Sequence, residues 1–361
     1  MSRFVQLHIL TAYPPSNPNR DDLGRPKTAL LGNEPRMRIS SQAIKRAIRE
    51  SIDFRAALQG SLGDRTQRLG EKVLDHLQTK EVEAERAAEI ARQVASAFGK
   101  VKSEKQKNER ERVHIEQLAF ISPDEKAFAF ELAERIASGE DLPKEKELAK
   151  IALRHADGAA DIAMFGRMLA DSPDFNRDAA VQVAHAITVN KVEVENDYYT
   201  AVDDLKERSE DAGAGFIGEA GFAAGVFYLY ACIDRPLLLA NLDGDRALAS
   251  RALDAMVKAL ATASPSGKRN SFANHVRAEY MLAERGDAQP RSLASAFIEP
   301  VGKGDQLALA IAKLTARREA FAKVYGKDWN DDIRLHVGAA DSSTLDEIAG
   351  FCAADLPEPA A

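Results

Sequence analysis

Residues 36–50, "RMRISSQAIKRAIRE", encode a strand, a helix cap and an amphipathic helix in succession. Basic and apolar side chains alternate in "RMRI", which predicts a strand with Arg36 and Arg38 on one face. Ser40 or Ser41 is expected to cap the helix, because a serine hydroxyl accepts a hydrogen bond from a free backbone N–H group. Apolar side chains then recur every three or four residues, so one face of the helix turns inward. A second stripe continues the basic face of the strand and consists of Gln42, Lys45, Arg46 and Arg49.

The chain is acidic overall, although this stretch is basic. Its formal net charge is −7, whereas residues 1–50 alone carry a net charge of +5. Global acidity argues against a protein that coats nucleic acid with its whole surface, but it leaves room for a local cationic patch. Residues 189–222 carry a net charge of −6. Two segments of opposite charge predict a separate partner for each.

Composition places the chain among globular proteins. With 361 residues, of which 45% are hydrophobic, the chain can bury a full core. Cys232 and Cys352 stand far apart, with no cysteine or histidine at metal-ligand spacing beside them, so we expect buried thiols and neither a disulfide nor a zinc site. The N-terminal apolar run is too short for a signal sequence, and no run approaches the ~20 apolar residues of a membrane span. The sequence therefore predicts a cytoplasmic protein without membrane association, bound metal or cofactor.

Strand and helix patterns alternate along the rest of the chain. "FVQLHIL" has the two-residue period of a half-buried strand, and a loop rich in Pro, Asn and Gly follows it. Residues 55–155 contain charged amphipathic runs typical of a helical insertion. Strands and helices arranged around long insertions predict an α+β fold with a ferredoxin-like core. The remaining expected elements are strands in "AAVQVAHAIT", "GVFYLYACID" and "AEYMLAE" and helices over residues 245–262 and 305–325.

Several long motifs stand in collinear order along the chain: "FVQLHIL", "NRDDLGRPKTALLG", "RMRISSQAIKRAIRE", "DIAMFGRM", "AHAITVNKVEVENDYYTAVDDL" and "GVFYLYACI". Together they resemble the CasC family, which is the repeated backbone subunit of the type I-E CRISPR surveillance complex, Cascade. The resemblance covers nearly the whole chain. It is strongest before residue 52 and from residue 160 to residue 232, and it is weakest through the helical insertion.

This resemblance implies an RRM-like or ferredoxin-like palm, a helical fingers insertion and a protruding thumb. The palm is expected at residues 1–55, 161–189 and 223–361, with helices at the C-terminal end, the fingers at residues 56–160 and the thumb at residues 190–222. Family members polymerise head to tail along the CRISPR RNA, grip its phosphates, kink it at regular intervals and present bases to target DNA in antiviral defence. The implied partners are CRISPR RNA, target DNA paired to it, further copies of the chain, and the large, small and guide-end-capping subunits of Cascade. The implied protein is a binding subunit of a helical ribonucleoprotein complex and not an enzyme.

Candidate RNA contacts follow from the resemblance together with the basic stripe. RNA that must pair with a target is held by its backbone, so Lys and Arg side chains with Ser or Gln donors suit the task. Met168 is implied as an apolar wedge against the bases at a kink. A solvated helix face is the alternative for the stripe, and simple exposure is the alternative for Lys268 and Arg269. The full candidate set is Arg20, Lys27, Arg38, Ser40, Gln42, Lys45, Arg49, Arg167, Met168, Lys268, Arg269 and Lys303.

The acidic thumb calls for a different partner, because carboxylates repel a guide strand. We expect thumb acids to face a basic surface of the neighbouring protomer or of another subunit. A head-to-tail contact that does not close generates a helical filament, and complementary charge would set its register. The candidate inter-subunit residues are Asp203, Asp204, Glu207 and Glu210.

Two other functional classes stay open. Asp21 and Asp22 could hold Mg²⁺ in a metal-dependent ribonuclease that acts on target RNA, or they could cap their own loop. His155 and Asp157 form another His/Asp pair, but further ligands are missing beside it. A self-assembling structural protein without nucleic acid is the third class.

Three ring side chains also have two interpretations. Tyr228 and Tyr230 could stack on bases as RRM aromatics do, although packing beneath the fingers is favoured. His185 is expected to be a hydrogen-bonded strand residue rather than a ligand.

Overall fold

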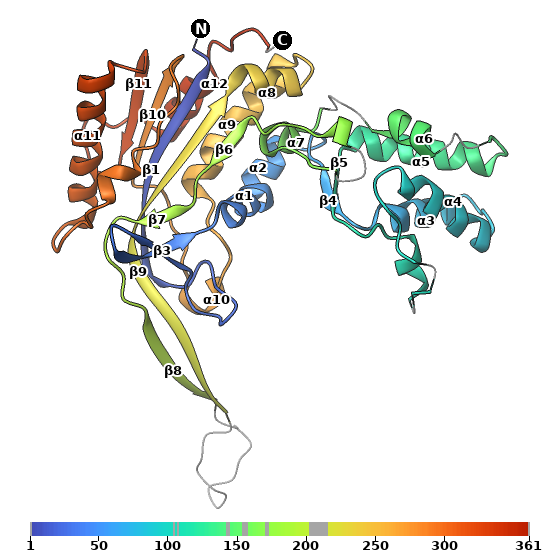
Figure 1. Ribbon diagram of the computed structural model, residues 1–361, viewed down its shortest axis with the longest axis horizontal. Helices are drawn as coiled ribbons and strands as arrows, with labels where there is room; N and C mark the ends of the chain where they lie inside the picture. Colours follow the sequence, from blue (N-terminus) through green and yellow to red (C-terminus); the bar gives the residue numbers. More distant parts are fainter. Residues whose placement is uncertain are drawn as a thin grey trace, which may run out of the picture.

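The computed structural model describes most of the chain, namely residues 2–103, 105–106, 108–141, 145–153, 158–169, 173–201 and 216–359. Its main sheet has the strand order β11-β10-β1-β9-β7-β3-β2, and β6 and β8 also pair with β9. Figure 1 shows this sheet with helices on both faces, a helical unit to one side and a long hairpin that projects from the sheet. The α+β class predicted from the sequence is confirmed.

The strands of the main sheet are β1 (Phe4–Ser16), β2 (Thr28–Leu31), β3 (Glu34–Ile39), β6 (Val181–Val183), β7 (Ala186–Thr188), β8 (Glu195–Ala201), β9 (Phe216–Asp234), β10 (Tyr280–Gly286) and β11 (Asp331–His336). A separate pair consists of β4 (Asp64–Thr66) and β5 (Ala119–Ile121). The α-helices are α1 (Ser41–Glu50), α2 (Ile52–Ala57), α3 (Leu69–Thr79), α4 (Ala84–Ser96), α5 (Pro123–Ala137), α6 (Glu145–Ala152), α7 (Ala160–Phe165), α8 (Arg235–Asn241), α9 (Arg246–Thr262), α10 (Arg269–Phe272), α11 (Gln306–Tyr325) and α12 (Leu345–Ala353). Short 3₁₀ helices are η1 (Glu109–Val113), η2 (Pro173–Phe175) and η3 (Ala294–Phe297).

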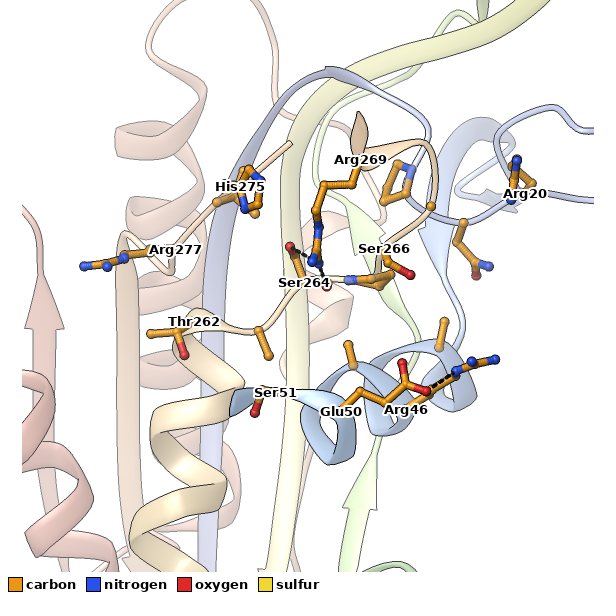
Figure 2. Close-up of a pocket in the computed structure, with 18 of the residues that line it drawn as sticks. Arg20, Arg46, Glu50, Ser51, Thr262, Ser264, Ser266, Arg269, His275 and Arg277 are labelled. Atoms are coloured by element: carbon orange, nitrogen blue, oxygen red, sulfur yellow. Dashed lines mark hydrogen bonds and ion pairs between the residues drawn. The ribbon is translucent and has the colours of Figure 1, made fainter. Parts of the chain in front are cut away.

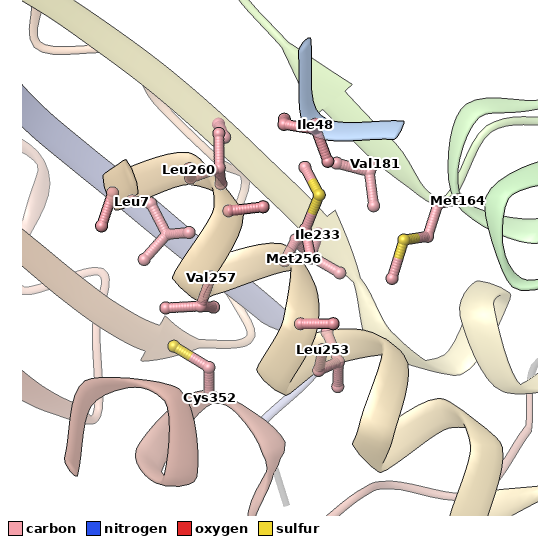
Figure 3. Close-up of a cluster of buried hydrophobic side chains, with 14 of the residues drawn as sticks. Leu7, Ile48, Met164, Val181, Ile233, Leu253, Met256, Val257, Leu260 and Cys352 are labelled. Atoms are coloured by element: carbon pink, nitrogen blue, oxygen red, sulfur yellow. The ribbon is translucent and has the colours of Figure 1, made fainter. Parts of the chain in front are cut away.

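Strand β1 lies at the centre of the sheet, paired with β9 on one side and β10 on the other. Its alternate residues Val5, Leu7 and Ile9 point into the main core. Helix α9 covers this face of the sheet, and Figure 3 shows Leu7 beside Val257 and Leu260 of that helix. The two-residue period therefore correctly predicted both the strand and its inward-facing side chains.

The opposite face of β1 is also covered, so the expectation of a half-buried strand is wrong. Gln6 and His8 are buried there, because η3 and α11 pack over this side of the sheet. The carboxylate of Glu284 lies 3.3 Å from Nε2 of His8 and accepts hydrogen bonds from Arg291 at 2.7 Å and Arg318 at 2.6 Å. Burial alone would raise the pKa of Glu284, but hydrogen bonds from His8 and Arg291 hold that pKa below its ordinary value.

The two tyrosines of β9 belong to this second covered face. The Tyr228 hydroxyl lies 2.9 Å from Nδ1 of His8 and accepts a hydrogen bond from the backbone N–H of Leu293 at 3.0 Å. The Tyr230 hydroxyl donates to the Gln6 side chain at 2.8 Å. Packing is thus the correct interpretation for both rings, but their partners come from the sheet and the η3 region and not from the fingers.

The predicted helical insertion contains a second hydrophobic core, built by α3, α4, α5 and α6 with η1 and β5. Buried side chains such as Val73, Ile90 and Leu132 meet in it. Figure 1 shows these helices beside the main sheet. The amphipathic runs in this part of the sequence are therefore helices, as expected, and the exact limits proposed for palm and fingers stay predictions.

The projecting hairpin is formed by β8 and the first part of β9. Glu195 pairs with Phe222 at its base and Ala201 pairs with Phe216 at its far end. Figure 1 shows it extending away from the sheet, in the region predicted to be the thumb. The acids Asp203, Asp204, Glu207 and Glu210 lie outside the described residues, so their inter-subunit role stays a prediction.

Both cysteines are buried and free. Burial raises the pKa of Cys232 and that of Cys352 to about 12, so both are protonated thiols at neutral pH. This confirms the expectation of buried thiols. Along the described segments, every helix is too short or too polar to cross a membrane.

Candidate nucleic-acid interface

The N-terminus of α1 is built as the sequence predicts. The Ser40 hydroxyl accepts a hydrogen bond from the backbone N–H of Ala43 at 3.3 Å, so Ser40 is the cap. The backbone N–H of Ser40 donates to the side chain of Asn19 at 2.9 Å, which ties the helix to the preceding loop. Because a hydroxyl that accepts can also donate, Ser40 keeps a proton for a ligand oxygen. Gln42 follows on an exposed position of the same helix.

The basic stripe of α1 divides into residues that are paired and one that is not. The Arg46 guanidinium pairs with Glu50 at 2.8 Å on the surface. Arg49 donates to the buried carboxylate of Asp161 at 2.9 Å, so its positive charge is already paired within the protein. Lys45 is half-buried, its ammonium lies 5.4 Å from the centre of a Phe165 ring, and burial lowers its pKa. In the described ranges Lys45 has no carboxylate partner, which leaves it available to an anion.

The position of Arg36 contradicts the basic face that was predicted for β3. Its side chain is fully buried, although the alternating pattern placed it with Arg38 on an accessible surface. The guanidinium donates to the carbonyl oxygens of Thr188 at 3.0 Å, Val189 at 2.8 Å and Phe297 at 2.9 Å. The sequence could not show this, because η3 comes from a segment far along the chain. Arg36 therefore fastens η3 to the sheet and is not a candidate ligand contact.

Arg38 and Lys27 lie next to His185 at the edge of the sheet. The Arg38 guanidinium lies 3.0 Å from Nδ1 of His185 and also donates to the Thr28 carbonyl oxygen at 3.2 Å. His185 is hydrogen-bonded, as expected, but the sequence offered no sign that it joins this cationic cluster. Desolvation and the charges of Arg38 and Lys27 lower its pKa.

Arg20 lines an open groove of about 1160 Å³ that lies between the loop of residues 18–24, one flank of α1 and residues 262–277. Figure 2 shows Arg20 on one wall and His275 and Arg277 on the other. His275 and Arg277 were not predicted from the sequence, since they occupy an irregular segment without periodicity or a motif. The groove also contains carboxylates, so its lining is of mixed charge.

Lys268 and Arg269 sit on the same irregular segment. The backbone of Lys268 is left-handed, with φ of 48°, and its side chain is half-buried. The Arg269 guanidinium donates to the carbonyl oxygen of Ser264, so it stabilises its own loop. The structure favours a local role for Arg269 over a contact with a ligand.

Met168 is exposed over 81% of its surface, which is unusual for a large apolar side chain. Hydrogen bonds of the two neighbouring residues fix the backbone that carries it. Arg167 exchanges backbone hydrogen bonds with Arg177 at 3.0 and 2.8 Å, and the backbone N–H of Leu169 donates to Asn176 at 2.6 Å. An exposed methionine on an anchored backbone is compatible with a wedge.

Arg167 was predicted to contact RNA, but the structure gives it a partner within the protein. Its guanidinium forms a buried ion pair with Glu125 at 2.7 Å, with the two side chains 1% and 0% exposed. It therefore links α5 of the helical unit to the segment that presents Met168. A phosphate cannot reach it without breaking that pair.

Lys303 is exposed on the loop before α11. Two residues earlier, the Val301 backbone N–H donates to the Val189 carbonyl oxygen at 2.9 Å, and Val301 forms a bridge with Asn190. The loop that carries Lys303 is therefore anchored to residues 189 and 190, which precede the projecting hairpin. We name Arg20, Lys27, Arg38, Lys45 and Lys303 the open cations, because no carboxylate of the described residues pairs with any of them.

Of the two acids in the first loop, Asp21 has a structural role. Asp21 accepts hydrogen bonds from the backbone N–H groups of Leu23 at 3.0 Å and Arg25 at 2.8 Å, as an acid that caps its loop does. Asp22 is exposed. His155 and Asp157, considered above as a second pair, lie outside the described residues. Across the residues with described positions, no three His, Cys, Asp or Glu side chains gather as metal ligands would.

Four of the open cations lie on α1 or on the loop and strands before it, an arrangement compatible with anion binding. The chain belongs to the CT1975-like protein family, whose family model matches residues 5–352. No curated protein sequence matches it.

Two solved structures are similar over nearly the whole chain. A subunit of a "CRISPR RNA-guided surveillance complex, pre-nicking" shares 30% sequence identity and a TM-score of 0.85, over 97% of this chain and 99% of that one. A subunit of a "CRISPR RNA-guided surveillance complex" shares 26% identity and a TM-score of 0.69, over 99% of this chain and 96% of that one. The family match and both structural similarities support a role as a subunit of a CRISPR surveillance complex.

Proposed function

We propose that this chain is the guide-binding backbone subunit of a type I-E CRISPR surveillance complex, that is, a CasC protein. The observation that carries the proposal is the similarity to a subunit of an RNA-guided complex over almost the full length of both chains. The motif resemblance points to the same subunit type. In this role the chain polymerises head to tail along CRISPR RNA in the cytoplasm and presents bases to target DNA, beside the large, small and guide-end-capping subunits.

The open cations support this proposal. Arg20, Lys27 and Arg38 belong to the loop and strands that precede α1, and Lys45 lies on the helix itself. Among the described residues none of them has a carboxylate partner, so each can neutralise a phosphate without first breaking an ion pair. Contacts of this kind hold a strand regardless of its bases, which suits a guide that must read its own target.

A binding role without catalysis is part of the proposal. The Asp21 carboxylate already serves two backbone N–H groups, which supports the loop-capping interpretation over a metal ligand. The discriminating assay incubates the assembled complex with RNA complementary to the guide and Mg²⁺. Periodic cleavage that disappears in Asp21→Ala would replace the binding proposal with the ribonuclease.

The first test is co-purification. We expect the purified protein to carry nucleic acid, seen as a raised ratio of absorbance at nucleic-acid and protein wavelengths, and the released RNA to have a defined size. Polymer without nucleic-acid absorbance would instead support the purely structural class.

A matched pair of variants on α1 tests the open cations. Lys45→Gln removes a cation without a partner, so we expect weaker RNA binding and a salt dependence reduced by about one phosphate contact. Arg46→Gln removes a cation that already pairs with Glu50, so its effect on RNA affinity should be smaller. Equal losses in both variants would contradict the distinction between open and paired cations.

A further inference from the structure

Beside β2, Arg38 contacts His185, and the charge of Lys27 acts on the same imidazole. Arg38 lies on β3, His185 directly precedes β7, and Lys27 directly precedes β2. Backbone hydrogen bonds hold them in place: the N–H of Lys27 donates to the Asn19 carbonyl oxygen, and the N–H of Arg38 donates to that of Lys27, both at 2.8 Å. Arg38 also lies opposite Ile187 of β7. The cluster is therefore a fixed part of the sheet edge.

The contact between Arg38 and His185 defines the state of the imidazole. A guanidinium has donors only, so Nδ1 of His185 must accept the hydrogen bond at 3.0 Å. The ring is then neutral, with its proton on Nε2. Arg38 and Lys27 are the charged groups that act on the ring, and both disfavour its protonation, as does burial. His185 nevertheless lies at an exposed position, within reach of a ligand.

Within the described ranges, the cluster has no counter-charge. Where the structure describes the chain, no carboxylate pairs with Lys27, Arg38 or His185. Elsewhere in the protein, Arg49 and Arg167 are each paired with a carboxylate, and the buried Arg36 donates to carbonyl oxygens. An anion at this edge would offset the positive charges of Lys27 and Arg38.

We propose that Lys27, Arg38 and His185 form a subsite for one phosphodiester group, and that His185 takes up a proton from solvent when the subsite fills. This inference rests on the proposed function, since the phosphodiester is that of the guide strand. When a phosphate oxygen accepts the Arg38 hydrogen bond, Nδ1 of His185 loses its donor and becomes free to bind a proton. The negative charge then stabilises the imidazolium, which donates from the ring to the phosphate.

The sign of the pH effect follows from linkage. The bound state holds more protons than the free state, so RNA affinity rises as pH falls through the pKa of His185 in the complex. A difference of about one pKa unit between bound and free protein corresponds to about a tenfold change in affinity per subsite. Above the pKa of the bound state the dependence disappears.

The test is isothermal titration calorimetry of the full chain with single-stranded oligouridine near pH 6.5, in two buffers of different ionisation enthalpy. The buffer dependence of the heat gives the number of protons taken up. We expect uptake in the wild type and its loss in His185→Asn. His336→Asn is the matched control, because His336 lies on β11 at the opposite edge of the sheet and should leave the uptake unchanged.

Each outcome has one meaning. Uptake that persists in His185→Asn, or that is absent from a wild type that binds RNA, would overturn the subsite. A wild type that binds no RNA at all would instead overturn the proposed function. Competition by inorganic phosphate that disappears in His185→Asn would support the subsite, and competition of equal strength in both proteins would oppose it. His185→Asn removes an exposed ring, so equal melting temperatures are expected and show that the variant is folded.

Discussion

Replacing Glu125 with glutamine tests how the helical unit is joined to the rest of the molecule. Glu125 stands in the first turn of α5, where its side chain accepts a hydrogen bond from the backbone N–H of Ser122 at 2.9 Å. The same carboxylate pairs with the buried guanidinium of Arg167 at 2.7 Å. Glutamine keeps the shape of the side chain and an oxygen for Ser122. The substitution removes the negative charge and replaces one of the two oxygens that accept from Arg167 with an amide donor.

The expected cost follows from the burial of the pair. With both side chains at most 1% exposed, the charge left on Arg167 has no water to compensate it. Removing one partner of a buried ion pair destabilises a protein by about 3–5 kcal/mol. The matched control is Lys126→Gln on the next residue, whose ion pair with Asp64 is 32% and 49% exposed. Exposed pairs contribute about 0–1 kcal/mol, so this control should change stability little.

Urea unfolding with two probes measures the effect. Far-ultraviolet circular dichroism follows the helices, while fluorescence follows Trp329, the single tryptophan. The guanidinium carbon of Arg318 lies 3.8 Å from the centre of the Trp329 ring. We expect Glu125→Gln to lower the midpoint of the dichroism transition more than that of fluorescence, since the pair lies beside the second core. Midpoints equal to those of Lys126→Gln would refute the reasoning. The double variant Glu125→Leu with Arg167→Met should recover much of the loss, because it removes both charges together.

The remaining predictions concern the main sheet and the exposed methionine. Arg36→Met should destabilise the protein by about 3 kcal/mol in chemical unfolding, because buried carbonyl oxygens lose a charged donor, and Arg36→Lys should cost less. Stability should fall as pH drops below about 4.5 toward the lowered pKa of Glu284, since protons then bind the unfolded chain first, and Glu284→Gln should flatten this decline in melting temperature. Met168→Ala should change stability by less than about 0.5 kcal/mol, because the side chain is exposed. It should also reduce the fluorescence of a 2-aminopurine base placed at a guide kink, if Met168 unstacks bases.

The cations of this protein differ in what they can bind, although they look alike in the sequence. Lys45, Arg46 and Arg49 share one helix and one stripe. Arg46 pairs with Glu50 within its own helix, and Arg49 pairs with Asp161 of α7. Only the partners distinguish them, and for Arg49 the partner comes from a distant segment.

Much of the secondary structure could be predicted from the sequence. The strand at "RMRI", the Ser40 cap and the helix that follows all depend on residues within a few positions of one another. Residue periodicity records one-sided burial, so α9 and α11 were also predicted within a residue of their observed ends. The α+β class follows from that order of elements.

The helices that cover the second face of the sheet, and the side-chain contacts between distant segments, could not be predicted from local periodicity. Helices η3 and α11 cover Gln6 and His8, so β1 is buried on both faces and not half-buried. Periodicity cannot report what packs on the polar face of a strand. "AAVQVAHAIT" forms two short strands instead of one, with His185 between them. That break is what brings His185 to Arg38.

The sequence by itself determined the sign and position of every charge, the helix cap and the order of strands and helices. Tertiary structure alone decided which of the charges are open to a ligand. Glu125 and Arg167, or Arg49 and Asp161, are far apart along the chain and in contact only after folding. The physical reason is that a side chain's charge is a local property, whereas the counter-charge and the exclusion of water that decide its use come from whichever segments the fold brings beside it.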